Sequence, residues 1–240
     1  MRKLLQRDTL NGVRFLDIGC GSGLFSLAAR NLGATVHSFD FDAKAVECAQ
    51  MLKAKYWQAD AQWTIEQGSI LDDRQVERLG AFDVVYAWGV LHHTGEMRRA
   101  IRNAASLVAP DGMLAIALYR KTAFCPFWTV EKRWYAKASP SAQRVARAIY
   151  VTAMRANFRL KSLNFRQYVD TYHSMRSMDF YHDVHDWMGG YPYESISPDE
   201  FRALADELSL TCIRSNCHPA GIGLFGSGCD EYVLQKMRKA

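Results

Sequence analysis

Hydrophobic and polar positions follow two alternating patterns through the first half of the chain. Short apolar runs bounded by polar residues or glycine are typical of buried strands, and they occur at 15–18, 34–39, 62–67, 82–88 and 113–119. Segments with apolar residues at helical spacing lie between them, at 24–32, 43–55 and 96–108. This alternation predicts an α/β fold with a parallel sheet and right-handed crossovers.

The alternation stops after the fifth predicted strand and resumes near residue 197. Ser197 followed by Pro198 indicates a helix start, and two further strands, 210–217 and 231–237, are joined by a glycine-rich loop. We therefore predict three segments. Residues 1–119 form a cofactor-binding core, residues 120–195 form a basic helical insertion that we expect to serve as a substrate lid, and residues 196–240 form the closing helix and strands of the same core.

A glycine-rich turn follows the first predicted strand, with glycine at positions 19, 21 and 23. At the carboxyl edge of an open sheet, such a turn lets a ligand approach the backbone and the start of the next helix. The spacing differs from the dinucleotide fingerprint, whose last glycine would fall on Leu24. The phosphate P-loop is excluded too, because no Gly-Lys-Ser/Thr sequence follows.

The run from Asp17 to Gly23, D-I-G-C-G-S-G, resembles the nucleotide loop of class I S-adenosylmethionine-dependent methyltransferases. The resemblance implies S-adenosylmethionine as cofactor, with Asp17 on its ammonium and the amides of Gly19, Gly21 and Gly23 near its carboxylate. The closing strands resemble the sixth and antiparallel seventh strands of that fold. The predicted fold is therefore a doubly wound Rossmann-like sheet of seven strands, interrupted by a helical insertion after the fifth.

Further cofactor contacts are expected where the next strands end. Asp40 ends the second strand and is placed to accept both ribose hydroxyls, with Phe41 beside it and Asp42 as the cap of the following helix. Related enzymes often bind adenine through an acidic residue just after the third strand, where this chain has Ser69 and Ile70. Trp88, at the end of the fourth strand, is expected to line the methyl end.

Two histidines, His92 and His93, follow the fourth strand at the edge where the methyl group would lie. Histidine suits a general base because its unperturbed pKa lies near working pH, so we predict transfer to oxygen and slightly favour His92 as the base. This loop resembles that of the quinone-biosynthesis O-methyltransferases, but their E-x-x-E-H reads G-V-L-H-H here. Neither the divalent metal nor the quinone substrate of that family therefore carries over.

Substrate contacts are expected from the end of the fifth strand and from the insertion. The candidates are Tyr119, His182, His185 and Tyr193. The two histidines are three residues apart and would share one helix face with Asp186, an arrangement that also fits a capped helix end at the surface. We assign no metal to it.

The positive charge of the chain is concentrated in the insertion. Net charge is +5, but residues 120–176 contain twelve Lys or Arg and two acidic residues, which leaves −5 for the remainder. On a helix over 141–159, one arc holds Arg144, Arg147, Arg155 and Arg159. The opposite side holds Ala146, Ile149, Ala153 and Ala156, which we expect to pack on the domain.

Such a helix could contact anionic lipid, suit a lipid-linked substrate, or steer an anionic small molecule. Binding of nucleic acid is the third reading. The fourth-strand loop argues against it, since it lacks the N/D-P-P-Y sequence of base amino methylation and a Pro-Cys pair.

The rest of the composition indicates a cytoplasmic protein. The six cysteines form no C-x-x-C pair, the N-terminus lacks an apolar signal core, and no apolar run is long enough to span a membrane. The predicted function is methylation of a small molecule, most readily at oxygen. The alternatives are an RNA methyltransferase that uses the basic insertion and a cofactor-binding partner protein without catalysis. The sequence leaves the oligomeric state open.

Overall fold

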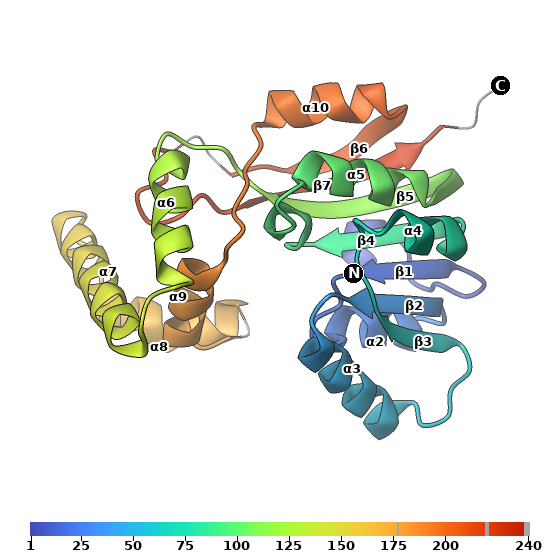
Figure 1. Cartoon of the computed structure of the whole chain (residues 1–240), viewed down its shortest axis with the longest axis horizontal. Helices are drawn as coiled ribbons and strands as arrows, with labels where there is room; N and C mark the ends of the chain where they lie inside the picture. The colour runs from blue at the N-terminus through green and yellow to red at the C-terminus, as the bar shows by residue number, and fades with distance from the viewer. Residues whose placement is uncertain (177, 219–220, 238–240) are drawn as a thin grey trace. The chain divides into compact units, whose positions relative to one another are not determined.

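A computed structural model describes residues 1–176, 178–218 and 221–237, and seven strands form one sheet (Figure 1). The sheet order is β3-β2-β1-β4-β5-β7-β6, and β7 runs antiparallel to both of its neighbours. The seven strands are β1 (Arg14–Ile18), β2 (Thr35–Asp40), β3 (Trp63–Gln67), β4 (Phe82–Trp88), β5 (Val108–Tyr119), β6 (Leu210–Asn216) and β7 (Cys229–Lys236). The predicted seven-stranded sheet with an antiparallel last strand is therefore confirmed.

Helices cover both faces of the sheet, and each face has its own apolar core. The face that carries Phe15 and Tyr86 is covered by α1 (Arg2–Leu5), α2 (Leu24–Asn31) and α3 (Ala43–Tyr56). The opposite face is covered by α4 (Asp73–Leu79), α5 (Met97–Ser106) and α10 (Pro198–Glu207). Local sequence starts several of these helices, since Asp42 and Asp72 accept backbone N–H bonds as N-caps and Ser197 with Glu200 forms a capping box.

The predicted turn at residues 109–112 lies inside β5 as a bulge. The pairing with β4 jumps from Phe82 opposite Val108 to Val84 opposite Met113. Gly112 is required there, because a Cβ at this position would lie 2.9–3.1 Å from three backbone carbonyl oxygens. The helix predicted over 96–108 is correspondingly shorter, because the residues that follow it already pair with β4.

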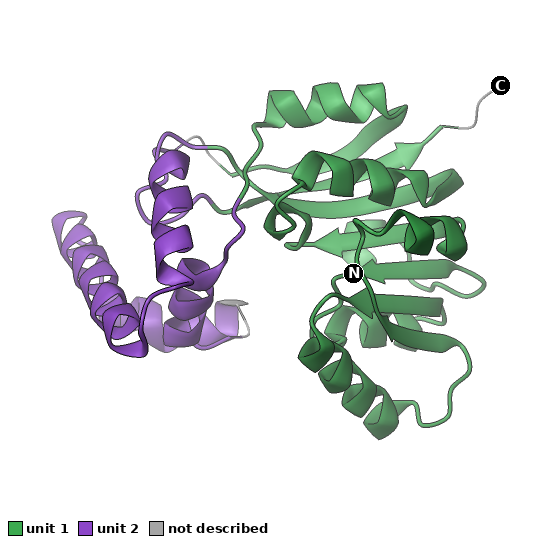
Figure 2. Ribbon diagram, in the orientation of Figure 1, with its two compact units in different colours: residues 1–121, 194–220, 228–240 green, residues 122–193, 221–227 purple. Residues whose placement is uncertain are grey.

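The chain divides into two compact units (Figure 2). Unit 1 comprises the sheet and its helices, over residues 1–121, 194–220 and 228–240. Unit 2 comprises residues 122–193 and 221–227. The helices of unit 2 are α6 (Cys125–Tyr135), α7 (Pro140–Leu160), α8 (Phe165–Arg176) and α9 (Phe180–Gly189).

Aromatic side chains form the centre of unit 2. Trp128 packs edge-on against Tyr150 and Trp187, and its indole N–H donates to the carbonyl of Gly223 over 2.7 Å. The hydroxyl of Tyr150 donates to the carbonyl of Phe225. These two bonds attach the loop 221–227, which follows β6 in the sequence, to the helices of the insertion.

The prediction of which face of the basic helix is buried was wrong. This helix is α7. In α7 the buried residues are Tyr150, Val151 and Met154, whereas Ile149 of the small-residue face is 65% exposed. Arg147, expected to be solvated with the other arginines, points inward and bonds to the Tyr135 hydroxyl. Larger side chains fill the space between the helices better than alanine does, and they set the rotation of α7. In the described ranges of the chain, no helix has both the length and the apolar character needed to cross a bilayer.

Candidate active site

The turn between β1 and α2 uses its glycines for different purposes. At Gly19, φ is 68°, and a Cβ would lie 2.3 Å from Cγ2 of Val90. The loop after β4 therefore rests directly on this residue. At Gly21, φ is 53°, and a Cβ would meet nothing within 4 Å. Gly21 thus leaves open space next to the backbone, and Gly23 is the N-cap of α2, so the turn can admit a ligand close to its amides.

Asp40 lies next to this turn at the end of β2. Its Oδ2 accepts a hydrogen bond from the Gly21 amide over 2.8 Å, and its Oδ1 accepts one from the Asp42 amide over 2.9 Å. A carboxylate has about four acceptor positions, so the two hydroxyls of a ribose could still bind to the same oxygens. The structure therefore brings Asp40 and the glycine turn together.

Asp17 is buried beneath the turn. Its carboxylate accepts the hydroxyl of Ser26 over 2.5 Å, and Ser26 also bonds to Ser38, which accepts the indole N–H of Trp63. Burial raises the pKa of Asp17 to about 7, although the Ser26 bond acts in the opposite direction. The sequence assigned this carboxylate to direct contact with a ligand, whereas in the structure it holds α2 against β1 and β2.

The other predicted cofactor contacts differ in their accessibility. Phe41 is 79% exposed beside Asp40, and Ser69 is half-buried, with its hydroxyl accepting from the Leu71 amide. The side chain of Ile70 is buried in the core and has no surface to offer a ligand. Gln75, which the sequence did not single out, orders this loop by accepting from the Ser69 amide over 2.8 Å.

His92 and His93 lie in a short 3-10 helix (Leu91–His93) after β4, but their surroundings differ. His92 is fully buried, its Nδ1 accepts from the Tyr119 amide over 3.2 Å, and its ring lies 3.8 Å from that of Tyr119. His93 is half-buried and packs edge-on against the same Tyr119 ring at 5.3 Å. Of the two rings, His93 is therefore the one that an incoming molecule can reach.

Glu194, which is not among the residues predicted from the sequence, supports the loop that carries His92 and His93. Its amide donates to the carbonyl of His92 over 3.0 Å, and its carboxylate accepts from the Met97 amide over 2.8 Å at the start of α5. Glu96 provides no side-chain cap for that helix. The contact joins residues 97 positions apart, so local sequence contains no signal for it.

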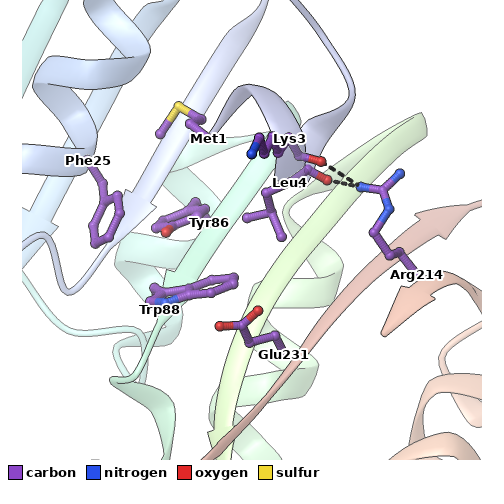
Figure 3. Close-up of a pocket in the computed structure, with 8 residues that line it drawn as sticks. All are labelled: Met1, Lys3, Leu4, Phe25, Tyr86, Trp88, Arg214 and Glu231. Carbon is purple, nitrogen blue, oxygen red and sulfur yellow. Dashed lines mark hydrogen bonds between the residues drawn. The ribbon is translucent and has the colours of Figure 1, made fainter. Parts of the chain in front are cut away.

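A pocket of about 360 Å³ opens beside the end of β4 (Figure 3). One wall is a stack of rings, with Phe25 5.0 Å from Tyr86 and Tyr86 parallel to Trp88 at 5.3 Å. Glu231 points into it near Trp88. The remaining lining residues are Met1, Lys3, Leu4 and Arg214, and the Arg214 guanidinium donates to the carbonyls of Lys3 and Leu4.

The pocket and the two histidines are connected through residues of neighbouring strands. Trp88 pairs with Ala117 in β5, and Ala117 pairs with Glu231 in β7, so the three residues form one row across the sheet. Tyr119 is two residues beyond Ala117 and points to the same face, and both histidine rings touch it.

The candidate substrate residues of unit 2 have structural contacts within that unit. The Nδ1 of His185 is bonded to the Tyr135 hydroxyl and to Arg147. Tyr193 is buried, and its hydroxyl lies 3.2 Å from both Cys125 Sγ and Ser227 Oγ. His182 is exposed at the start of α9. Among the described residues, no group of three or more His, Cys, Asp or Glu is arranged to hold a metal ion.

The fold and the glycine turn define an open α/β sheet of the class I methyltransferase type. Residues 16–114 match the family described as a methyltransferase domain. The chain is 33% identical to a ubiquinone biosynthesis O-methyltransferase from Caulobacter sp. strain K31, over 48% of this chain and 44% of that protein. It is 34% identical to the protein of the same name from Xanthomonas campestris pv. campestris strain B100, over 48% of this chain and 47% of that one.

Solved structures share the fold at low sequence identity. Magnesium protoporphyrin IX methyltransferase from Synechocystis PCC 6803, solved with bound SAH, has a TM-score of 0.58 and 16% identity, and the match covers 98% of this chain and 78% of that one. An O-methyltransferase family protein from Burkholderia thailandensis has a TM-score of 0.56 and 17% identity, covering 95% and 52%.

Residues 16–114 therefore match a methyltransferase domain, and the chain has the fold of the class I S-adenosylmethionine-dependent methyltransferases. This confirms the predicted class and its cofactor, S-adenosylmethionine. The chain matches less than half the length of the two ubiquinone biosynthesis relatives.

Proposed function

We propose that the protein transfers a methyl group from S-adenosylmethionine to a hydroxyl oxygen of a small aromatic molecule, with His93 as the general base. The observation that carries the proposal is the row from Trp88 through Ala117 to Glu231. It joins an aromatic pocket to Tyr119 and thereby to the accessible histidine, at the strand ends next to the glycine turn. The name of the curated relatives, ubiquinone biosynthesis O-methyltransferase, supports an oxygen acceptor.

The cofactor, when bound, supplies a methyl group on a positively charged sulfur. The turn at Gly19 and Gly21 and the start of α2 would bind its carboxylate, because their amides and the helix dipole favour an anion. Asp40 would accept the ribose hydroxyls, and the exposed ring of Phe41 would cover the adenine. Asp17 would act from below, since its bond to Ser26 holds the helix start in place.

The acceptor would lie against the accessible rings of Phe25 and Trp88, with the buried ring of Tyr86 stacked on Trp88. Offset stacking and burial of apolar area favour a planar ring there. Glu231 would accept a hydrogen bond from a second polar group of the acceptor, which would orient it. His93 would take the hydroxyl proton as the oxygen attacks the methyl carbon, while buried His92 and Tyr119 keep the loop in position.

Calorimetric titration with S-adenosylmethionine, and separately with NAD, tests the cofactor site. We expect micromolar binding of the former alone, and Asp40→Ala is the matched variant that should weaken it. Binding of NAD in preference to S-adenosylmethionine would contradict the assignment of the site.

Transfer of a labelled methyl group to a panel of phenols and catechols tests the acceptor. We expect turnover that is lost in His93→Ala and reduced chiefly through KM in Glu231→Gln. Labelling of RNA instead of the phenols would refute the acceptor class. Cofactor binding with no transfer to any phenol would refute the proposed reaction but not the cofactor site.

A further inference from the structure

Unit 2 has an exposed apolar stripe along its longest helix. The stripe consists of Val145, Ile149, Ala153, Ala156 and Leu160 on α7, and all five residues are exposed. Leu160 is 87% exposed. At 100° per residue the five positions fall within an arc of about 80°, on the side of the helix away from Tyr150, Val151 and Met154. The stripe runs from Val145 to Leu160, which at 1.5 Å per residue is about 23 Å along the helix.

The preceding helix repeats this arrangement. In α6 the side chains of Cys125, Trp128 and Tyr135 are buried. Phe127, Val130 and Trp134 are exposed at helical spacing on the opposite side. Folded soluble proteins rarely expose a row of apolar side chains as long as the stripe on α7 without a partner for it.

Exposed positive charge accompanies the apolar residues. Six Lys or Arg side chains between residues 125 and 161 are exposed: Arg133, Lys137, Arg144, Arg155, Arg159 and Lys161. The single acidic residue in that range, Glu131, has its carboxylate oxygens buried. Three of the arginines, Arg144, Arg155 and Arg159, lie along one flank of the stripe. The surface therefore offers cations with no exposed anion among them.

We propose that the exposed face of α7 docks on an anionic phospholipid bilayer, with the stripe inserted among the acyl chains and the flanking arginines on lipid phosphates. An amphipathic helix of this kind lies in the plane of the membrane interface. The charge distribution of the chain agrees, since residues 120–176 carry +10 and the remainder −5. Attraction to an anionic surface would therefore act on this segment and orient the molecule.

The same residues fit other occupants less well. A second copy seated on the stripe would bring two rows of arginine together. A nucleic acid would use the arginines, but the α7 stripe consists of aliphatic side chains, which give its bases no ring to stack on. The proposal does not depend on the proposed methyl transfer, because it concerns binding alone.

Cosedimentation of the full chain with vesicles tests it. One set of vesicles contains phosphatidylcholine alone, and the other contains phosphatidylcholine and phosphatidylglycerol in equal parts. We expect binding to the mixed vesicles only, weakened by added salt. Absence of binding to the mixed vesicles would overturn the proposal.

Two pairs of variants locate the surface. Val145→Glu with Ile149→Glu should lower vesicle affinity by about a hundredfold, because both side chains lose their apolar burial and gain charge. Met51→Glu with Tyr56→Glu is the control on α3, where both residues are also exposed, and it should bind within a few-fold of wild type. Equal binding by these two double variants would overturn the assignment to α7.

Charge is tested in the same way. Arg144→Gln with Arg159→Gln should lower affinity roughly tenfold, whereas Arg98→Gln with Arg202→Gln removes the same charge from unit 1 and should have a smaller effect. Light scattering without lipid completes the test. A dimer that the Val145→Glu, Ile149→Glu variant dissociates would assign the stripe to a second copy and refute the membrane proposal.

Discussion

Alanine substitution at three glycines with similar backbone angles can distinguish a glycine required for packing from one required for ligand binding. Gly12, Gly19 and Gly21 all have positive φ, at 74°, 68° and 53°. Alanine in this conformation costs about 1 kcal/mol. A Cβ at Gly12 or Gly21 meets nothing within 4 Å, whereas at Gly19 it would lie 2.3 Å from Val90 Cγ2 and 2.9 Å from its Cβ. The three variants therefore share the backbone cost and differ in what surrounds the new methyl group.

The expected magnitudes follow from these surroundings. Gly12→Ala and Gly21→Ala should each lower the free energy of unfolding by about 1 kcal/mol. Gly19→Ala should lower it by about 3 kcal/mol, because overpacking adds roughly 2 kcal/mol when Val90 must move. For binding of S-adenosylmethionine the order changes. Gly21→Ala should weaken it at least about tenfold, since its methyl group enters the space left for the ligand, and Gly12→Ala should not change it.

Urea unfolding followed by circular dichroism measures the first quantity, and calorimetric titration with S-adenosylmethionine measures the second. Equal cofactor affinity in Gly21→Ala and Gly12→Ala would refute the placement of the ligand at the turn. Equal stability of Gly19→Ala and Gly12→Ala would refute the close packing of the Val90 loop on the turn.

Three further predictions concern single side chains. Asp40→Ala should weaken S-adenosylmethionine binding by about 2 kcal/mol, because charged hydrogen bonds to the ribose are lost; unchanged affinity in a calorimetric titration would exclude that role. His93→Ala should lower kcat by about a hundredfold or more at unchanged cofactor affinity. His92→Ala should mainly lower the free energy of unfolding, by about 2 kcal/mol, since the Tyr119 amide loses its buried acceptor. If kinetics and urea unfolding show instead that His92→Ala loses kcat and His93→Ala loses stability, the two roles would be exchanged. Because burial raises the pKa of Asp17 from 3.8 to about 7, the folded protein keeps a proton that the unfolded chain releases between these values, so the free energy of unfolding should fall as pH rises through that window. Asp17→Asn should remove this fall, which urea midpoints measured at about pH 5 and about pH 8 would show. If the midpoint of the variant still declines between these two pH values as in wild type, the assignment to Asp17 is contradicted.

The sequence was informative wherever a feature depends on neighbouring residues. The strand-helix alternation, the spacing of the three glycines and the acidic residue ending β2 are local patterns, and they were enough to predict the sheet, its superfamily and its cofactor. The cap at Asp42 was predictable for the same reason, since a capping side chain bonds within its own helix turn.

Roles that depend on contacts between distant residues could not be read in this way. His92 and His93 are adjacent and chemically identical, and only packing against Tyr119, 27 positions away, buries one ring and leaves the other accessible. Glu194 gave no local signal, and Asp17 proved to support the turn from below. The rotation of α7 was predicted wrongly, because a helical projection orders residues around the axis but does not say which side faces the other helices.

By itself, then, the sequence determined the order of the strands and helices, the class of the protein and the chemistry of the turn that its cofactor requires, because short-range backbone preferences and spacing encode these features. The tertiary structure alone decided which histidine is reachable, where the aromatic pocket lies and which face of α7 is left uncovered. These depend on burial, and burial is set jointly by side chains that meet only when the chain has folded.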